Sequence, residues 1–143
     1  MIERITYQNK LLSIIIRARF KKDGIEFFTP CEFSQQLAYM KRQEGYSISP
    51  HVHNVLHREV QFTHEVLFVK SGKVRVDFYD DEKAYVESCI LNPGDVILLA
   101  CGGHGFTMLE ESEMIEVKQG PYSGDKDKTH FNCVKESEIK IKE

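Results

Sequence analysis

The stretch GYSISPHVHNVLHREVQFTHEVLFVKSG, residues 45–72, combines a His-x-His pair with a strongly β-prone run. The pair is His51 and His53, and the run begins at Glu65 and ends before Gly72. Side chains two residues apart on a β-strand point to the same face. We therefore expect a strand at the pair, with both imidazoles pointing in one direction.

The β-prone run predicts a strand over residues 60–69. Strand alternation places Glu65 on the same face as the apolar Leu67 and Val69, which suits the interior of a sheet protein. His64 falls on the opposite face and is expected to be solvated. The sequence thus predicts a carboxylate that points inward among apolar side chains.

The rest of the chain also favours β-structure. Residues 74–79 alternate strictly, with Val74, Val76 and Phe78 on one face. Asp23-Gly24 predicts a hairpin turn between residues 11–20 and 25–28, and a second turn signal is Asn92-Pro93-Gly94-Asp95. The remaining strands are expected at 5–9, 85–91, 96–100, 105–109 and 114–117. About ten short strands between turn signals predict an all-β sandwich or barrel.

One segment, FSQQLAYMKRQ at residues 33–43, is compatible with a helix or a strand. Ser34 could cap a helix, and most of the other residues are good helix formers. The alternation of Leu37, Tyr39 and Lys41 favours a strand instead. We prefer the strand because the segment leads directly into the turn at Gly45.

Length and composition limit the possible classes of protein. The 143 residues are expected to form one domain, with a core at about 36–118, N-terminal strands at 5–28 and a tail at 119–143 that ends in a frayed charged segment. The formal net charge of -3 does not suggest a nucleic-acid partner. No apolar run approaches the roughly 20 residues that span a bilayer, and no signal peptide is visible. We therefore expect a cytoplasmic protein, without a membrane partner, whose four cysteines are reduced thiols.

A third histidine, His104, follows Gly102-Gly103, and alternation places it with the apolar Phe106 and Met108. Three imidazoles and a carboxylate inside an apolar interior are costly unless they bind something. Such a set suits a divalent transition metal such as Fe, Mn, Zn or Ni. A vestigial site, or one that binds a small ligand without metal, is the alternative.

These motifs resemble those of the cupin superfamily. Gly45, five residues, His51-x-His53, then Glu65, six residues and Gly72 are similar to the first cupin motif. Residues 93–104 approximate the second motif. The resemblance covers about residues 36–118. It implies a double-stranded β-helix, or jelly-roll barrel, whose metal ligands are His51, His53, Glu65 and His104.

Two departures from the cupin pattern affect the site. The family places its glutamate three or four residues after the second histidine, whereas eleven residues separate His53 from Glu65. Glu59 is closer and shares strand parity with Glu65, but we prefer Glu65 because of its spacing to Gly72. The second motif has Ala100-Cys101-Gly102 in place of proline-x-glycine, and a cysteine thiol near the metal is one reading of Cys101.

The resemblance implies a metal-dependent enzyme that acts on a small polar molecule. Isomerases, epimerases, dioxygenases and decarboxylases occur among cupins, and small single-domain cupins are associated with sugar and polysaccharide metabolism. A non-catalytic protein that binds a small ligand is the alternative, and an assembly protein with a vestigial site is a third. Lys118 and Gln119 could line the cavity or lie on the surface. Residues 11–16 are apolar on both faces, which predicts a homodimer.

Overall fold

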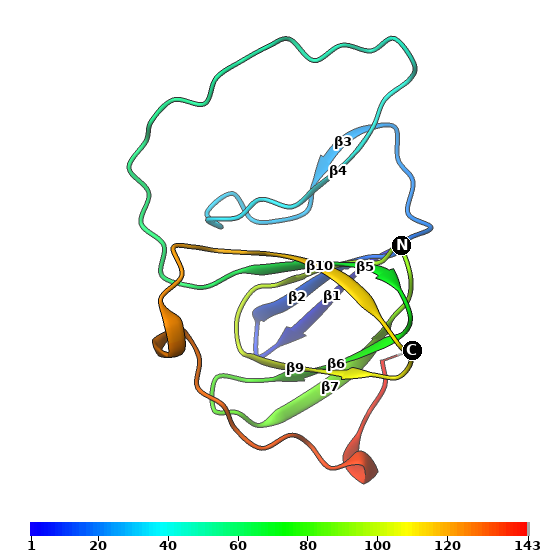
Figure 1. The fold of residues 1–143 in the computed structure, drawn as a ribbon, viewed down its shortest axis with the longest axis vertical. Coiled ribbons are helices and arrows are strands. Elements are labelled where there is room, and N and C mark those ends of the chain that lie inside the picture. Colours follow the sequence, from blue (N-terminus) through cyan, green and yellow to red (C-terminus); the bar gives the residue numbers. More distant parts are fainter. Residues whose placement is uncertain (143) are drawn as a thin grey trace. The chain divides into compact units, whose positions relative to one another are not determined.

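The computed structural model describes residues 1–142 and contains ten β-strands in three antiparallel sheets (Figure 1). The all-β prediction is confirmed, and the described residues include no α-helix. No helix in this part of the chain has the length and hydrophobicity needed to cross a membrane. The strands are β1 (Ile2–Tyr7), β2 (Lys10–Ile16), β3 (Gly24–Phe27), β4 (Ala38–Lys41), β5 (Glu65–Ser71), β6 (Val74–Tyr79), β7 (Tyr85–Leu91), β8 (Val96–Leu99), β9 (Gly103–Met108) and β10 (Glu113–Lys118).

The chain divides into two compact units, which we describe separately. The first combines Met1–Phe20 with the chain from Phe62 onward, and the second is Lys21–Gln61. The first unit holds a five-stranded sheet of order β1-β2-β8-β5-β10 and a three-stranded sheet of order β7-β6-β9. The second unit holds the hairpin formed by β3 and β4.

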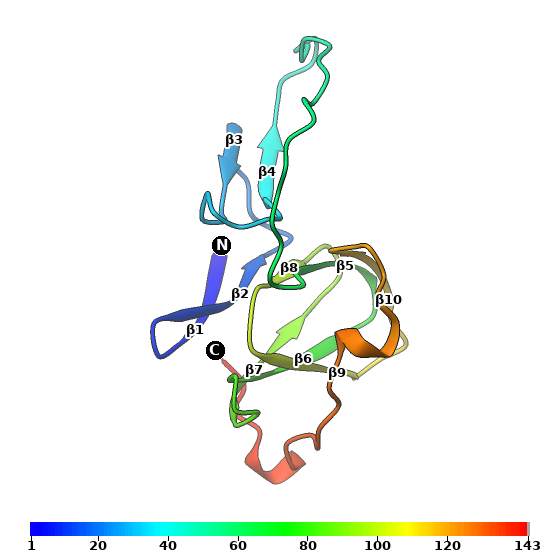
Figure 2. The ribbon, with the colours of Figure 1, turned by 90° about the vertical axis from the view of Figure 1, so that its left-hand side faces the viewer.

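The two sheets of the first unit face each other and enclose one apolar core (Figure 2). In the described residues, strand pairing does not join these sheets into a closed barrel. Fully buried side chains contribute from both sides, because alternate residues of each strand point inward. The core residues are Ile5, Leu12, Ile15, Leu67, Val69, Ile97 and Leu99 from the five-stranded sheet, and Val74, Val76, Phe78, Cys89 and Leu91 from the other.

Asp95, in the predicted turn before β8, is the acceptor of a buried hydrogen-bond network. Its carboxylate accepts bonds from the backbone N–H of Ala18 at 2.8 Å and of Asn92 at 3.0 Å. Arg17 donates to the same carboxylate at 2.8 Å and also binds Glu3 at 2.7 Å. The strand predicted over residues 11–20 ends at Ile16. The prediction was too long because the chain turns at 17–18 to meet Asp95.

The outer face of β6 is buried as well as its inner face. Arg75 pairs with Asp77 at 2.9 Å and makes two further bonds to Glu136, at 2.8 and 2.9 Å. The Ser88 backbone bonds to both Lys140 and Lys142 at 2.8 Å. The expectation of a frayed tail is therefore wrong for the last described residues, up to Lys142, because the C-terminal segment (red in Figure 1) covers this sheet.

In the second unit β3 pairs with β4, with Ile25 opposite Met40. The hairpin predicted at Asp23-Gly24 is wrong, because β3 does not pair with β2. The strand preferred for residues 33–43 is confirmed over Ala38–Lys41. The strand expected at His51 and His53 is wrong, since residues 42–61 include no strand.

Candidate functional site

Glu65 and His104 meet in the interior of the first unit, although they lie in different sheets. Glu65 is the first residue of β5, and its side chain is almost fully buried. His104, on β9, lies opposite Phe78 of β6. The ring centroid of His104 is 5.5 Å from that of Phe106. The distance from His104 Nε2 to Glu65 Oε2 is 3.0 Å. Two of the four predicted ligands are therefore brought together by the strand alternation that predicted them.

The surroundings of Glu65 favour its ionised form. The hydrogen bond from His104 lowers the pKa of the Glu65 carboxyl, while burial acts in the opposite direction. The positive charges of Lys128 and Lys118 lower this pKa further, and the net shift is downward. Glu65 is therefore a buried carboxylate that can bind a cation.

Lys118 is the third polar side chain at this end of the interior. It lies opposite Glu65 in the pairing of β10 with β5, so the two side chains share a face. Its Nζ atom is 4.0 Å from Glu65 Oε1. One carboxylate oxygen thus faces His104 and the other faces Lys118. Alternation from Met114, which packs against the core, could have identified Lys118 as inward-facing.

His51 and His53 lie in the second unit, outside any strand, and both are exposed. Their rings are edge to face, with centroids 5.3 Å apart, and His51 Nδ1 is 2.9 Å from the carbonyl oxygen of Ser49. The structure thus brings His51 to His53 and Glu65 to His104, each pair within its own unit. Glu59 is exposed in the same strand-free stretch, so strand parity does not apply to it.

Two other residues singled out in the sequence, Cys101 and His64, are shielded from solvent to different degrees. Cys101 donates its thiol to the carbonyl oxygen of Leu11 at 3.2 Å, and burial raises the pKa of that thiol. His64 is buried rather than solvated, and burial lowers its pKa. The prediction that His64 is exposed to solvent is wrong. Strand β5 begins at Glu65, so the alternation of that strand does not extend to His64.

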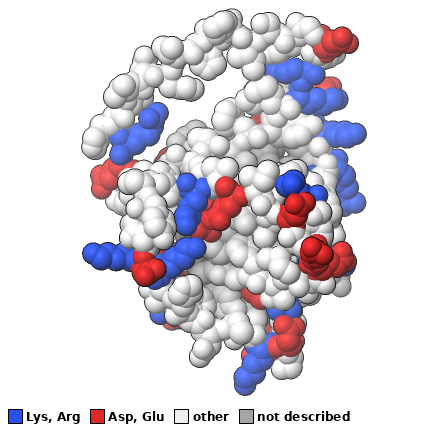
Figure 3. Space-filling model, in the orientation of Figure 1, with Lys and Arg blue, Asp and Glu red and all other residues white. Residues whose placement is uncertain are grey.

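The charged side chains do not form a uniform surface on the face drawn in Figure 3. Lys and Arg are interspersed there with Asp and Glu. Proteins that bind nucleic acids usually carry a basic patch or stripe. This face therefore offers no argument for such a partner.

Glu65 and His104 present two donor atoms of the types that bind transition metals. An imidazole nitrogen and a carboxylate oxygen both suit first-row divalent metals. Among residues 1–142, no group of three or more His, Cys, Asp or Glu side chains is arranged to hold a metal ion. A complete site therefore needs ligands in addition to this pair.

Comparison with protein-family models, with curated proteins and with solved structures finds no match for this chain. The argument for its function therefore rests on the residues and the geometry described above.

Proposed function

We propose that this chain is a cupin-like protein that binds a divalent transition metal and acts on a small polar molecule. Glu65 and His104 would supply two of its ligands. The observation that carries the proposal is the 3.0 Å approach of the buried Glu65 carboxylate to His104. Each of these groups is a metal ligand when deprotonated, and their donor atoms face each other within the first unit.

The path of the chain through the first unit supports a jelly-roll assignment. After β5 the chain enters the three-stranded sheet as β6 and β7, returns as β8, crosses again as β9 and returns as β10. Crossing between two facing sheets is the arrangement expected of a double-stranded β-helix. In that fold the ligands would come from the inner faces of strands, as Glu65 and His104 do.

The bound metal would supply Lewis-acid or oxygen-binding chemistry at a small substrate. Within the chain, the Glu65 carboxylate would stabilise a bound cation. The apolar core beneath it would keep water from the buried side of the site. A second candidate function is direct binding of a small ligand without metal and without catalysis. The hydrogen bond between Glu65 and His104 favours this alternative, because it satisfies both groups without a metal.

Metal content distinguishes the two functions. We expect the purified protein to contain a stoichiometric transition metal, identified by elemental analysis and an X-ray absorption-edge scan. The variant His104→Ala is expected to lose most of this metal, because one of the two protein ligands is removed. The exposed His57 and His130 provide the control, since His57→Ala/His130→Ala should retain it. A metal-free protein that holds a small acid or sugar would favour the second function, and unchanged metal in the first variant would remove His104 from the site.

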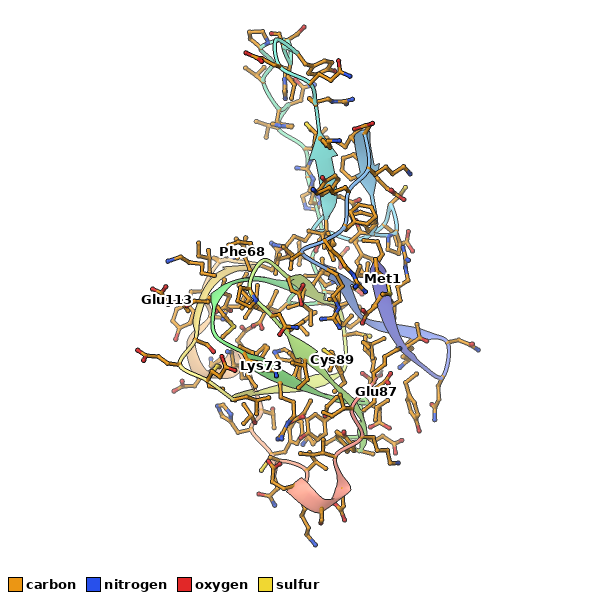
Figure 4. The ribbon with its side chains drawn as sticks, turned by 90° about the vertical axis from the view of Figure 1, so that its right-hand side faces the viewer. Met1, Phe68, Lys73, Glu87, Cys89 and Glu113 are labelled. Atoms are coloured by element: carbon orange, nitrogen blue, oxygen red, sulfur yellow. The ribbon has the colours of Figure 1, made fainter. Side chains whose placement is uncertain are left out.

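We also propose a homodimer, on a different surface from the one that the sequence indicated. Both faces of β2 are buried within the single chain, so its apolar residues do not require a partner. The outer face of β5 and β10 is instead apolar and open, with Phe68, Ile115 and Val117 39%, 53% and 56% exposed. Figure 4 labels Phe68 on this face. Phe68 lies opposite Ile115, and β10 is an edge strand. An edge strand beside an apolar face suits an interface between two identical chains.

The variant Ile115→Lys is expected to shift the protein from dimer to monomer, because it places a charge in the apolar interface. Light scattering at micromolar concentration would measure the mass. Val55→Lys is the matched control, since Val55 is fully exposed and lies outside this face. A monomeric wild-type protein would contradict the proposal.

A further inference from the structure

We propose that Lys118 binds an oxyanion group, a carboxylate or a phosphate, on the molecule that this site accepts. The inference rests on the proposed metal site and specifies the chemical class of its ligand. Lys118 Nζ lies 4.0 Å from Glu65 Oε1, on the same face of the sheet. An ammonium at this position would stand next to any molecule bound at Glu65 and His104.

Lys118 has one ion-pair partner among the described residues, and that partner is Glu65. The distance of 4.0 Å is too long for a hydrogen bond, so the ammonium retains donors for another acceptor. Its side chain is mostly buried, with 23% of its surface exposed. A partly desolvated ammonium attracts an anion more strongly than a surface lysine does, because less water screens it.

The local charge changes when a metal binds. Without metal, the single negative charge of Glu65 offsets the single positive charge of Lys118. A divalent ion adds two positive charges, and neutral imidazole ligands offset neither of them. The metal carries a charge of +2, Glu65 carries −1 and Lys118 carries +1, so the partly buried site has a net charge of +2. Positive charge at Lys128, which also acts on Glu65, increases the imbalance.

An oxyanion would reduce this imbalance by placing negative charge beside the metal and Lys118. Binding should therefore be coupled, with the anion binding better to the metal-loaded protein and the metal binding better when the anion is present. Lys118 would supply a charge-assisted hydrogen bond to the anion. A neutral sugar lacking such a group would gain nothing from the ammonium.

The test uses the 143-residue chain loaded with Co²⁺, whose absorption spectrum reports changes at the metal. Acetate and inorganic phosphate are titrated separately, so that the two arms distinguish a carboxylate from a phosphate. We expect at least one of them to bind, and Lys118→Met to weaken that binding by about tenfold or more, the loss expected for one charge-assisted hydrogen bond. Lys70→Met is the matched control, because Lys70 is an exposed lysine on the neighbouring strand β5.

Metal affinity separates this inference from the proposed function. Lys118→Met should bind Co²⁺ as tightly as the wild type or more tightly, because a positive charge near the ligand carboxylate is removed. If the wild type takes up no metal, the proposed function fails and this inference fails with it. If metal binds but neither anion does, or if Lys118→Met binds the anion as the wild type does, the inference alone is overturned.

Discussion

Asp95→Ala is expected to lower the free energy of unfolding by about 3–5 kcal/mol, the usual cost of breaking a buried ion pair by removing one partner. The carboxylate is buried and accepts bonds from Arg17 Nη1 and from the backbone N–H groups of Ala18 and Asn92. Alanine leaves all three donors without this acceptor. Because small domains have about 5–15 kcal/mol of stability in total, the loss would be readily detected.

Urea unfolding followed by circular dichroism measures this effect. Asp23→Ala is the control, because Asp23 is an exposed aspartate whose ion pair with Lys41 spans 2.7 Å at the surface. Exposed pairs contribute roughly 0–1 kcal/mol. Asp95→Asn should lose less than Asp95→Ala, since the amide oxygen still accepts one or two of the bonds. Equal urea concentrations at the unfolding midpoints of Asp95→Ala and Asp23→Ala would contradict the role assigned to Asp95.

Local sequence signals were sufficient for two strands of the three-stranded sheet, whereas the third, β9, begins at Gly103, before the predicted residues 105–109. The predicted residues 74–79 and 85–91 match β6 and β7 at both ends. Alternation and a turn signal determine such strands without reference to distant residues. Gly72, between β5 and β6, has a φ of 82°, and a Cβ there would lie 2.2 Å from the carbonyl oxygen of Glu111. Glycine is therefore required at this position by both backbone conformation and packing.

The errors occurred where distant residues decide the structure. Strand β2 stops at Ile16 because Arg17 and Ala18 bind Asp95, nearly eighty residues away in the chain. Charged residues near the C-terminus are typical of a frayed tail, but Arg75 binds Glu136 across 61 positions. Neither pairing has a local signature, so neither could be predicted from residue pattern alone.

Only part of the candidate site could be predicted from the sequence, because local alternation places a side chain only where a strand forms. Parity placed Glu65 and His104 on inner faces, and both strands formed, so the pair is in contact. Parity could not place His51 and His53, because it has meaning only on a strand, and a strand requires a partner for its backbone groups. Pro50, which donates no backbone hydrogen bond, precedes the pair and disfavours a sheet there.

Glu65→Gln is expected to lower metal affinity by about 100-fold or more, at the upper end of the range for residues around a metal site. Glutamine has the shape of glutamate, and its amide oxygen can accept the bond from His104 Nε2 that Glu65 accepts at 3.0 Å. The substitution therefore removes the negative charge while preserving the fold. Thermal unfolding of the metal-free protein should verify that the fold is retained.

Glu59→Gln makes the same chemical change at the rival carboxylate and is the matched control. Glu59 is exposed and lies outside any strand, so we expect the metal affinity of Glu59→Gln to stay within about twofold of the wild type, as for an ordinary surface substitution. Calorimetric titration with Co²⁺ compares the two variants directly. A large loss for Glu59→Gln with none for Glu65→Gln would identify Glu59 as the ligand. If neither variant changes the affinity, then no glutamate from this stretch binds the metal, and the buried pair of Glu65 and His104 has another role.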